Sequence, residues 1–108
     1  MTIDDAITEV TSGRATLVDV RTNEEYAGGH AKGAMNFDVS LLAEDHDPGY
    51  DKDHQLYVYC HSGGRAQHAQ MLFERMGYQN VVNLGGLSQW EAAGGETASG
   101  SVCKVSDN

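Results

Sequence analysis

Cys60 and Arg65 lie close together near the middle of the chain, and their residue types suit nucleophilic chemistry on an anionic substrate. Four residues separate them: His61, Ser62, Gly63 and Gly64. A thiol at a helix start, beside a cation, is pushed toward the reactive thiolate form by backbone N–H groups and by the positive charge. We therefore predict that Cys60 is a nucleophile and that the residues up to Arg65 form its substrate-binding loop.

The loop is expected to join a strand to a helix. Residues 55–60 alternate Leu56 and Val58 with tyrosines, which is typical of a strand. After the loop, apolar residues recur at helical spacing until Gly77, which is a typical helix stop. Such a unit points several N–H groups at the space where anions bind. Arg65 is then expected to bind the anionic end of a substrate.

The remaining loop residues have different expected roles. Ser62 has a hydroxyl that can donate a hydrogen bond to a bound anion. Gly63 and Gly64 are expected to adopt backbone conformations that a side chain would forbid. His61 either tunes the nucleophile and binds substrate or simply faces solvent, and the sequence leaves both interpretations open.

The pattern C-x-x-G-x-R resembles the active-site loop of the rhodanese-like sulfurtransferases, the thiosulfate sulfurtransferase family. Other stretches are similar to that family's motifs in the same order: LVDVR and EY within 17–26, GHAKGAMN at 29–36, GY at 77–78, VVNLGG at 81–86 and Trp90. The resemblance runs from about Leu17 to Trp90 and covers most of the chain.

This resemblance implies a three-layer α/β/α rhodanese-like fold with a mainly parallel sheet of four to five strands. It also implies a double displacement through a persulfide on Cys60. The sulfur donor is expected to be a small anion such as thiosulfate, or a persulfide or polysulfide. The acceptor is expected to be cyanide, a small thiol or a protein thiol, and no cofactor is required. Strands that alternate with helical segments independently favour a parallel sheet covered on both faces.

Two other functions are weighed against sulfur transfer. Cell-cycle phosphatases and related arsenate reductases share this fold and a Cys-to-Arg loop, but their loop has five intervening residues and makes a wider cradle. The four-residue spacing here favours the tighter, sulfur-sized form. The other alternative is a non-catalytic rhodanese-like binding module; such modules commonly lose the cysteine that this chain retains.

Pattern and capping residues predict the other elements. Helices are expected at 3–10 after a Thr2 N-cap, at 24–26 after an Asn23 cap, at 39–44 and at 87–93. Strands are expected at 16–20, 34–37 and 80–84, with at most a vestigial fifth strand in the sheet. Trp90 is expected to anchor the core. The rhodanese-like domain is predicted to span 1–94, and 95–108 to form a flexible tail.

Composition limits the partners. The chain has 108 residues, a net charge of −9 and only seven lysines and arginines, which argues against nucleic acid. No apolar run approaches the ~20 residues of a membrane span. We expect a monomer, in the cytoplasm if Met1 is the natural start, or in the periplasm if an export signal has been removed.

Several other residues could suggest a site but favour a simpler interpretation. Arg21, Glu25 and His30 are expected to form an ion-paired network that fastens loops at the strand ends. An acidic stretch from Asp45 does not fit a calcium loop, since Tyr50 stands where the sharp-turn glycine belongs, and the histidines do not match a zinc pattern. The second cysteine, Cys103, is expected to be a bystander, with a resolving thiol as the alternative.

Overall fold

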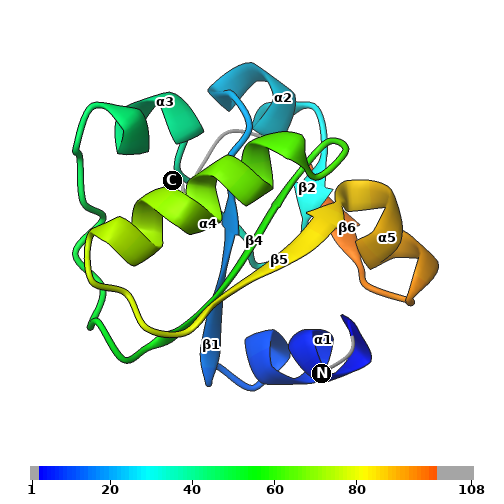
Figure 1. Cartoon of the computed structure of the whole chain (residues 1–108). Helices are drawn as coiled ribbons and strands as arrows, with labels where there is room; N and C mark the ends of the chain where they lie inside the picture. The colour runs from blue at the N-terminus through cyan, green and yellow to red at the C-terminus, as the bar shows by residue number, and fades with distance from the viewer. Residues whose placement is uncertain (1–2, 100–108) are drawn as a thin grey trace, which may run out of the picture.

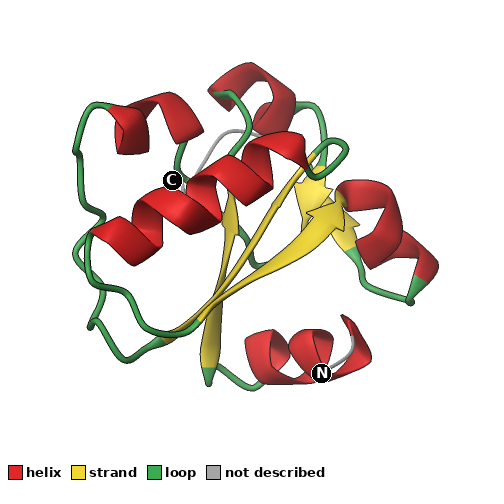
Figure 2. Ribbon diagram, in the orientation of Figure 1, coloured by secondary structure: helices red, strands yellow, loops and turns green. Residues whose placement is uncertain are grey.

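The computed structural model describes residues 3–99, which form an α/β fold with helices on both faces of a parallel sheet (Figures 1 and 2). The helices are α1 (Ile3–Thr11), α2 (Asn23–Ala27), α3 (Val39–Ala43), α4 (Gly64–Arg75) and α5 (Leu87–Ala92). The strands are β1 (Ala15–Asp19), β2 (His30–Ala31), β3 (Met35–Asn36), β4 (Gln55–Cys60), β5 (Val81–Gly86) and β6 (Thr97–Ala98). No helix within residues 3–99 is long and apolar enough to cross a membrane.

The main sheet has four parallel strands in the order β3-β1-β4-β5. The predicted α/β fold with a parallel sheet flanked by helices is therefore confirmed. Two further short strands, β2 and β6, pair antiparallel in a separate two-stranded sheet. Because β1 and β4 are central, their residues are buried on both faces, which explains their nearly continuous apolar character.

Two apolar cores lie on opposite faces of the sheet. Alternate residues of β4 point to opposite sides, as the period of a strand requires. Leu56, Val58 and Cys60 pack with α3 and α4 in one core, whereas Tyr57 and Tyr59 pack with residues of α1, α2 and α5 in the other. The nucleophile predicted from sequence therefore points toward α4, whose first turn follows it in the chain. Trp90 is buried in the second core, as expected.

The helix after β1 begins one residue earlier than predicted. Thr22, not Asn23, is the N-cap, because its hydroxyl accepts a hydrogen bond from the backbone N–H of Glu25. The Glu25 carboxylate in turn accepts from the backbone N–H of Thr22, which completes a capping box. This arrangement fixes the Glu25 side chain at the start of α2. The proposed Thr2 cap of the first helix lies outside the described residues.

The predicted tail boundary also differs from the structure. The backbone oxygen of Glu96 accepts hydrogen bonds from the Lys32 N–H (2.8 Å) and from the Trp90 indole Nε1 (2.7 Å). β6 follows directly and pairs with β2, so residues 96–98 are held to the domain by backbone hydrogen bonds despite their polar composition. The rest of the predicted tail, from residue 100, lies outside the described residues.

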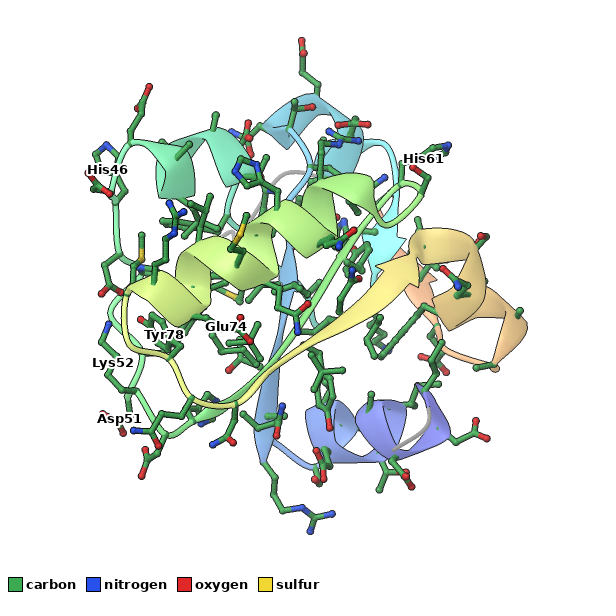
Figure 3. All side chains as sticks on the ribbon, viewed as in Figure 1. His46, Asp51, Lys52, His61, Glu74 and Tyr78 are labelled. Carbon is green, nitrogen blue, oxygen red and sulfur yellow. The ribbon has the colours of Figure 1, made fainter. Side chains whose placement is uncertain are left out.

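The acidic stretch before β4 folds as a turn tied to the end of α4. The Asp47 carboxylate accepts from the Gly49 N–H, from Lys52 Nζ and from the Tyr78 hydroxyl. These bonds lower the pKa of Asp47 to about 2, with Lys52 as the largest cause. Lys52 Nζ also lies 3.9 Å from the centre of the Tyr78 ring, at the end of the molecule away from His61 (Figure 3).

Candidate active site

The loop between β4 and α4 folds around the Cys60 thiol. Cys60 is the last residue of β4, and its side chain is 1% exposed. The backbone N–H of Gly63 points at the sulfur, with 2.8 Å between the nitrogen and Sγ. A donor directed at a sulfur stabilises negative charge on it. The structure thus places a backbone donor on the sulfur that sequence reasoning selected.

Gly63 is the N-cap of α4 and has a positive φ of 101°. A side chain would strain the backbone in this left-handed region, so the predicted need for glycine holds at Gly63. The same prediction is wrong for Gly64, which begins the helix without a positive φ and where a Cβ would meet nothing within 4 Å. With glycine at the cap, no side chain caps the helix. The N–H groups of residues 64–66 have no acceptor within the helix, because an α-helix leaves its first donors unpaired. These donors and the helix dipole make the start of α4 favourable for an anion.

His61 and Ser62 are both exposed, as is Gly64. Neither the His61 ring nor the Ser62 hydroxyl forms a hydrogen bond or ion pair with the rest of residues 3–99. Figure 3 shows the His61 side chain pointing away from the ribbon at the loop. The structure is therefore consistent with the solvent-facing interpretation of His61, and it leaves both side chains available to a ligand at the loop.

Arg65 forms an ion pair with Glu25, which the sequence predicted to lie in a network with Arg21 and His30. Its guanidinium donates Nη1 to Glu25 Oε1 at 2.7 Å and Nη2 to Glu25 Oε2 at 3.0 Å. The hydrogen bond to Arg65 is the main cause that lowers the pKa of Glu25 to about 2, and the same bond raises the pKa of Arg65. The nearby Cys60 sulfur also raises the pKa of Arg65. The loop cation is thus held by a two-pronged ion pair beside the thiol.

The predicted network of Arg21, Glu25 and His30 is therefore wrong as a single unit. Arg21 instead binds Asp19, with Nη2 at 2.7 Å from Oδ2, and donates to the backbone oxygen of Gly29. His30 stacks on Tyr26 with ring centroids 3.7 Å apart, and its Nδ1 lies 2.8 Å from the backbone carbonyl oxygen of Tyr26. The three residues still fasten loops at the strand ends, but each does so through a different partner.

A buried polar cluster supports the end of β4. Asp19 is fully buried and accepts hydrogen bonds from Arg21 and from the Tyr59 hydroxyl, the latter at 2.7 Å. Burial, with the Asp19 charge as the next cause, raises the pKa of Tyr59. The Tyr59 oxygen also accepts from the Ala31 N–H at 2.9 Å. Because Tyr59 directly precedes Cys60, these bonds fix the strand end from which the Cys60 side chain projects.

The end of β5 supports the loop from the other side. Asn83 donates Nδ2 to the Gly63 oxygen at 3.3 Å, and its Oδ1 accepts from the Gly85 N–H at 2.7 Å. A Cβ placed on Gly86 would lie 2.2 Å from the backbone oxygen of His61. From the sequence, this segment is predicted only as a strand at 80–84 and as part of a motif at 81–86. The double glycine was visible in the sequence, but its contact with the loop depends on the pairing of β4 and β5.

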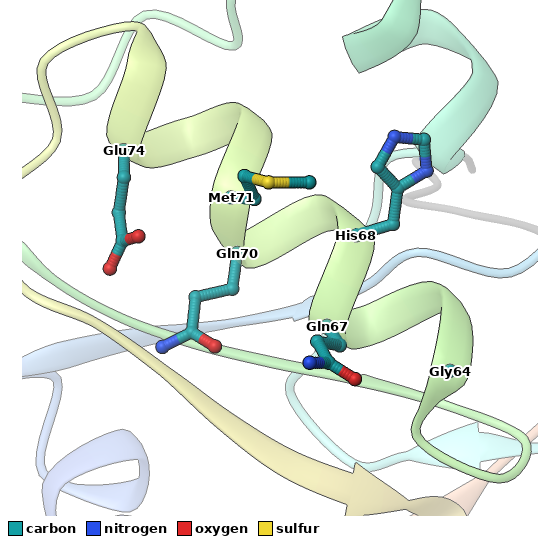
Figure 4. A pocket seen from close by; sticks show the side chains of 6 residues that line it. All are labelled: Gly64, Gln67, His68, Gln70, Met71 and Glu74. Carbon is teal, nitrogen blue, oxygen red and sulfur yellow. The ribbon is translucent and has the colours of Figure 1, made fainter.

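A cavity of about 510 Å³ lies along the exposed side of α4 (Figure 4). Its lining consists of Gly64, Gln67, His68, Gln70, Met71 and Glu74. The cavity adjoins the loop through Gly64 but does not include the thiol. Among residues 3–99, no three histidine, cysteine, aspartate or glutamate side chains are placed to hold a metal ion.

Comparison with known proteins identifies the family of this chain. A family model described as a rhodanese-like domain matches residues 2–93. The chain is 34% identical over 99 residues to thiosulfate sulfurtransferase GlpE of Actinobacillus succinogenes, covering 82% of this chain and 88% of that protein. It is 35% identical over 71 residues to thiosulfate sulfurtransferase PspE of Escherichia coli, covering 65% of this chain and 68% of that one.

Among solved structures, the crystal structure of the Alr3790 protein from Anabaena superposes with a TM-score of 0.82 at 28% sequence identity. The superposition covers 93% of this chain and 80% of that chain. Some curated relatives are longer proteins, and this chain spans only 19% of one and 53% of another.

Proposed function

The chain belongs to the family of rhodanese-like domains, and from that premise we propose that it is a sulfurtransferase that carries sulfur as a persulfide on Cys60. The observation that carries the proposal is the hydrogen bond from the Gly63 N–H to the Cys60 sulfur at the open start of α4. This geometry suits a sulfur atom that bears negative charge before and after each transfer. The similarity to proteins named thiosulfate sulfurtransferases supports the same reaction class.

The proposed reaction is a double displacement. The Cys60 thiolate attacks the outer sulfur of thiosulfate, forming a sulfur–sulfur bond to Sγ, while the donor's own sulfur–sulfur bond breaks and sulfite leaves with the electron pair. The enzyme is then a persulfide anion. Cyanide, a small thiol or a protein thiol attacks the terminal sulfur, and the Cys60 thiolate leaves. Charge and atoms balance in both halves, so neither an oxidant nor a cofactor is required.

The loop supplies the binding groups. The N–H groups from residue 61 to residue 65 are proposed to surround the terminal sulfur, and Arg65 to hold the anionic end of the donor. Ser62 and His61, exposed at the mouth of the loop, are available to a donor or an acceptor. The cavity along α4 offers a surface beside the loop to an acceptor that is itself a protein.

Mass spectrometry of the intact protein tests the proposal directly. Protein treated with thiosulfate should gain one sulfur atom, which cyanide or a thiol should remove. Cys60→Ser should lose both the adduct and turnover while remaining folded, because the replacement is nearly isosteric. The proposal fails if thiosulfate, polysulfide and a thiol persulfide all leave the mass of the wild-type protein unchanged; a non-catalytic binding module would then be the better interpretation.

A parallel assay separates the proposal from the phosphatase and arsenate reductase alternative. The four-residue spacing between Cys60 and Arg65 should exclude useful hydrolysis of an aryl phosphate. Robust phosphatase turnover without sulfur transfer would overturn the assignment. Arg65→Ala should retain the sulfur adduct but weaken donor binding, seen as a raised KM for thiosulfate.

A further inference from the structure

The positive charge that can attract an anionic sulfur donor to the loop is smaller than the sequence indicates. Arg65 is the cation nearest Cys60 in the chain, but both of its terminal nitrogens donate to Glu25. The two side chains are 38% and 37% exposed, so their pair lies at the surface of the loop and not in the core. Glu25 therefore neutralises much of the positive charge that would otherwise attract an anion.

Glu25 is held in this position by its own helix. Its Oε1 accepts not only from Arg65 but also from the backbone N–H of Thr22 at 3.1 Å and from the Thr22 hydroxyl at 3.2 Å. These bonds belong to the capping box of α2. An anionic sulfur donor that binds Arg65 must therefore compete with the Glu25 carboxylate, which the capping box holds in place.

The other described cations do not compensate. Arg21 is buried against Asp19, and Lys32 pairs with Glu96. Lys52 pairs with Asp47 in the acidic turn. Arg14 precedes β1, at the end of the parallel strands opposite the end that carries Cys60, and Arg75 is the last residue of α4. No lysine or arginine within residues 3–99 therefore adds an unpaired charge at the loop.

We propose that Glu25 is a specificity-determining residue that disfavours dianionic thiosulfate and favours sulfur donors of lower charge, such as thiol persulfides and thiosulfonates. This inference rests on the sulfurtransferase function proposed above. With a persulfide donor, R–S–SH, the Cys60 thiolate forms a bond to the outer sulfur, the donor's sulfur–sulfur bond breaks, and RS⁻ leaves with the electron pair. The proton stays on the transferred sulfur, so the product is Cys60–S–SH, which becomes the persulfide anion when it releases that proton to solvent. With a thiosulfonate, the leaving group is a sulfinate monoanion in place of sulfite.

Two donors of similar shape and different charge test the proposal. Thiosulfate is a dianion, whereas methanethiosulfonate is a monoanion in which a methyl group replaces one charged oxygen. In a double displacement, the kcat/KM for the donor reports on loading of Cys60 alone. Glu25→Gln removes the charge but keeps one acceptor oxygen, now that of an amide, at the third helical position, where glutamine also suits a capping box. It should raise kcat/KM for thiosulfate about threefold to tenfold more than for methanethiosulfonate.

Glu24→Gln is the matched control, since it removes the same charge from an exposed neighbour that has no side-chain contact with Arg65. The ratio of the two kcat/KM values should stay at the wild-type value in this variant. An unchanged ratio in Glu25→Gln, or an equal fall for both donors, would overturn the inference and leave Glu25 as a support for Arg65. If neither donor places sulfur on wild-type Cys60, the proposed function itself fails.

Discussion

Gly86→Ala should disturb catalysis far more than it disturbs the fold. The new Cβ would lie 2.2 Å from the His61 oxygen and 3.0 Å from its carbonyl carbon, whereas ordinary contacts begin near 3.4 Å. Both atoms belong to the backbone of the loop, so the loop must retreat by about 1 Å because no flexible side chain can absorb the clash. Overpacking of this kind costs about 1–3 kcal/mol of stability. A displacement of about 1 Å at a reacting group can cost about 10²-fold in rate.

The assay is thiosulfate-to-cyanide turnover, measured beside chemical denaturation of the same variant. Gly28→Ala is the control, because its Cβ meets nothing closer than 3.6 Å and its φ of −78° suits alanine. We expect the control to keep wild-type turnover and Gly86→Ala to lose about 10²-fold while unfolding cooperatively. Full turnover in a folded Gly86→Ala protein would refute the idea that the end of β5 positions the loop.

Three further outcomes are expected. Lowering the pH from 4.5 to about 2 should destabilise the wild-type protein more than the Glu25→Gln variant. The pKa of Glu25 is about 2 in the folded protein, so the stability that the Glu25 carboxylate contributes is lost as the pH falls through this range. Chemical denaturation at several pH values measures this loss. Truncation after Gly94 should lower the free energy of unfolding by about 1–3 kcal/mol or more, because the Lys32 N–H and the Trp90 indole N–H lose the Glu96 oxygen as their acceptor. Truncation after Ser99 keeps these hydrogen bonds and should not lower it. Cys103→Ser should leave thiosulfate-to-cyanide turnover close to wild type, and loss of most turnover would identify a resolving thiol instead.

The local residue pattern was enough to place the strand before Cys60 and the helix after it. The strand predicted at 55–60 matches β4, because alternating apolar residues in a central strand leave little freedom of register. The predicted stop at Gly77 also holds, and its φ of 103° explains why glycine is used there. Both features depend on residues that are neighbours in the chain.

The Thr22 cap could also have been read from sequence. The run Thr22-Asn23-Glu24-Glu25 contains the spacing of a capping box when it begins at Thr22. Asn23 is an equally good cap by residue type alone, but it has no acid or amide three residues later. The position of Glu25 therefore decides between the two candidates.

Contacts between distant segments could not be predicted in this way. Glu25 and Arg65 are 40 residues apart, and their pairing depends on where α2 lies relative to the start of α4. The short strand β6 contains too few apolar residues to give a pattern, and backbone hydrogen bonds to β2 hold it in place. Sequence alone thus selected Cys60 as the candidate nucleophile, but it did not reveal that Glu25 pairs with the neighbouring cation, Arg65.

In the proposed reaction, the burial of Cys60 makes the unloaded and sulfur-loaded forms of the loop differ in which molecules can reach the reactive sulfur. Because Cys60 is only 1% exposed, we expect loading to require a slender donor that presents its terminal sulfur end-on. Loading lengthens the side chain by one sulfur–sulfur bond, about 2 Å, which carries the reactive atom outward. We then expect a bulky thiol acceptor to collect the sulfur at the mouth of the loop more readily than it contacts the resting cysteine. The loop would thus restrict the size of the sulfur donor more strictly than the size of the acceptor.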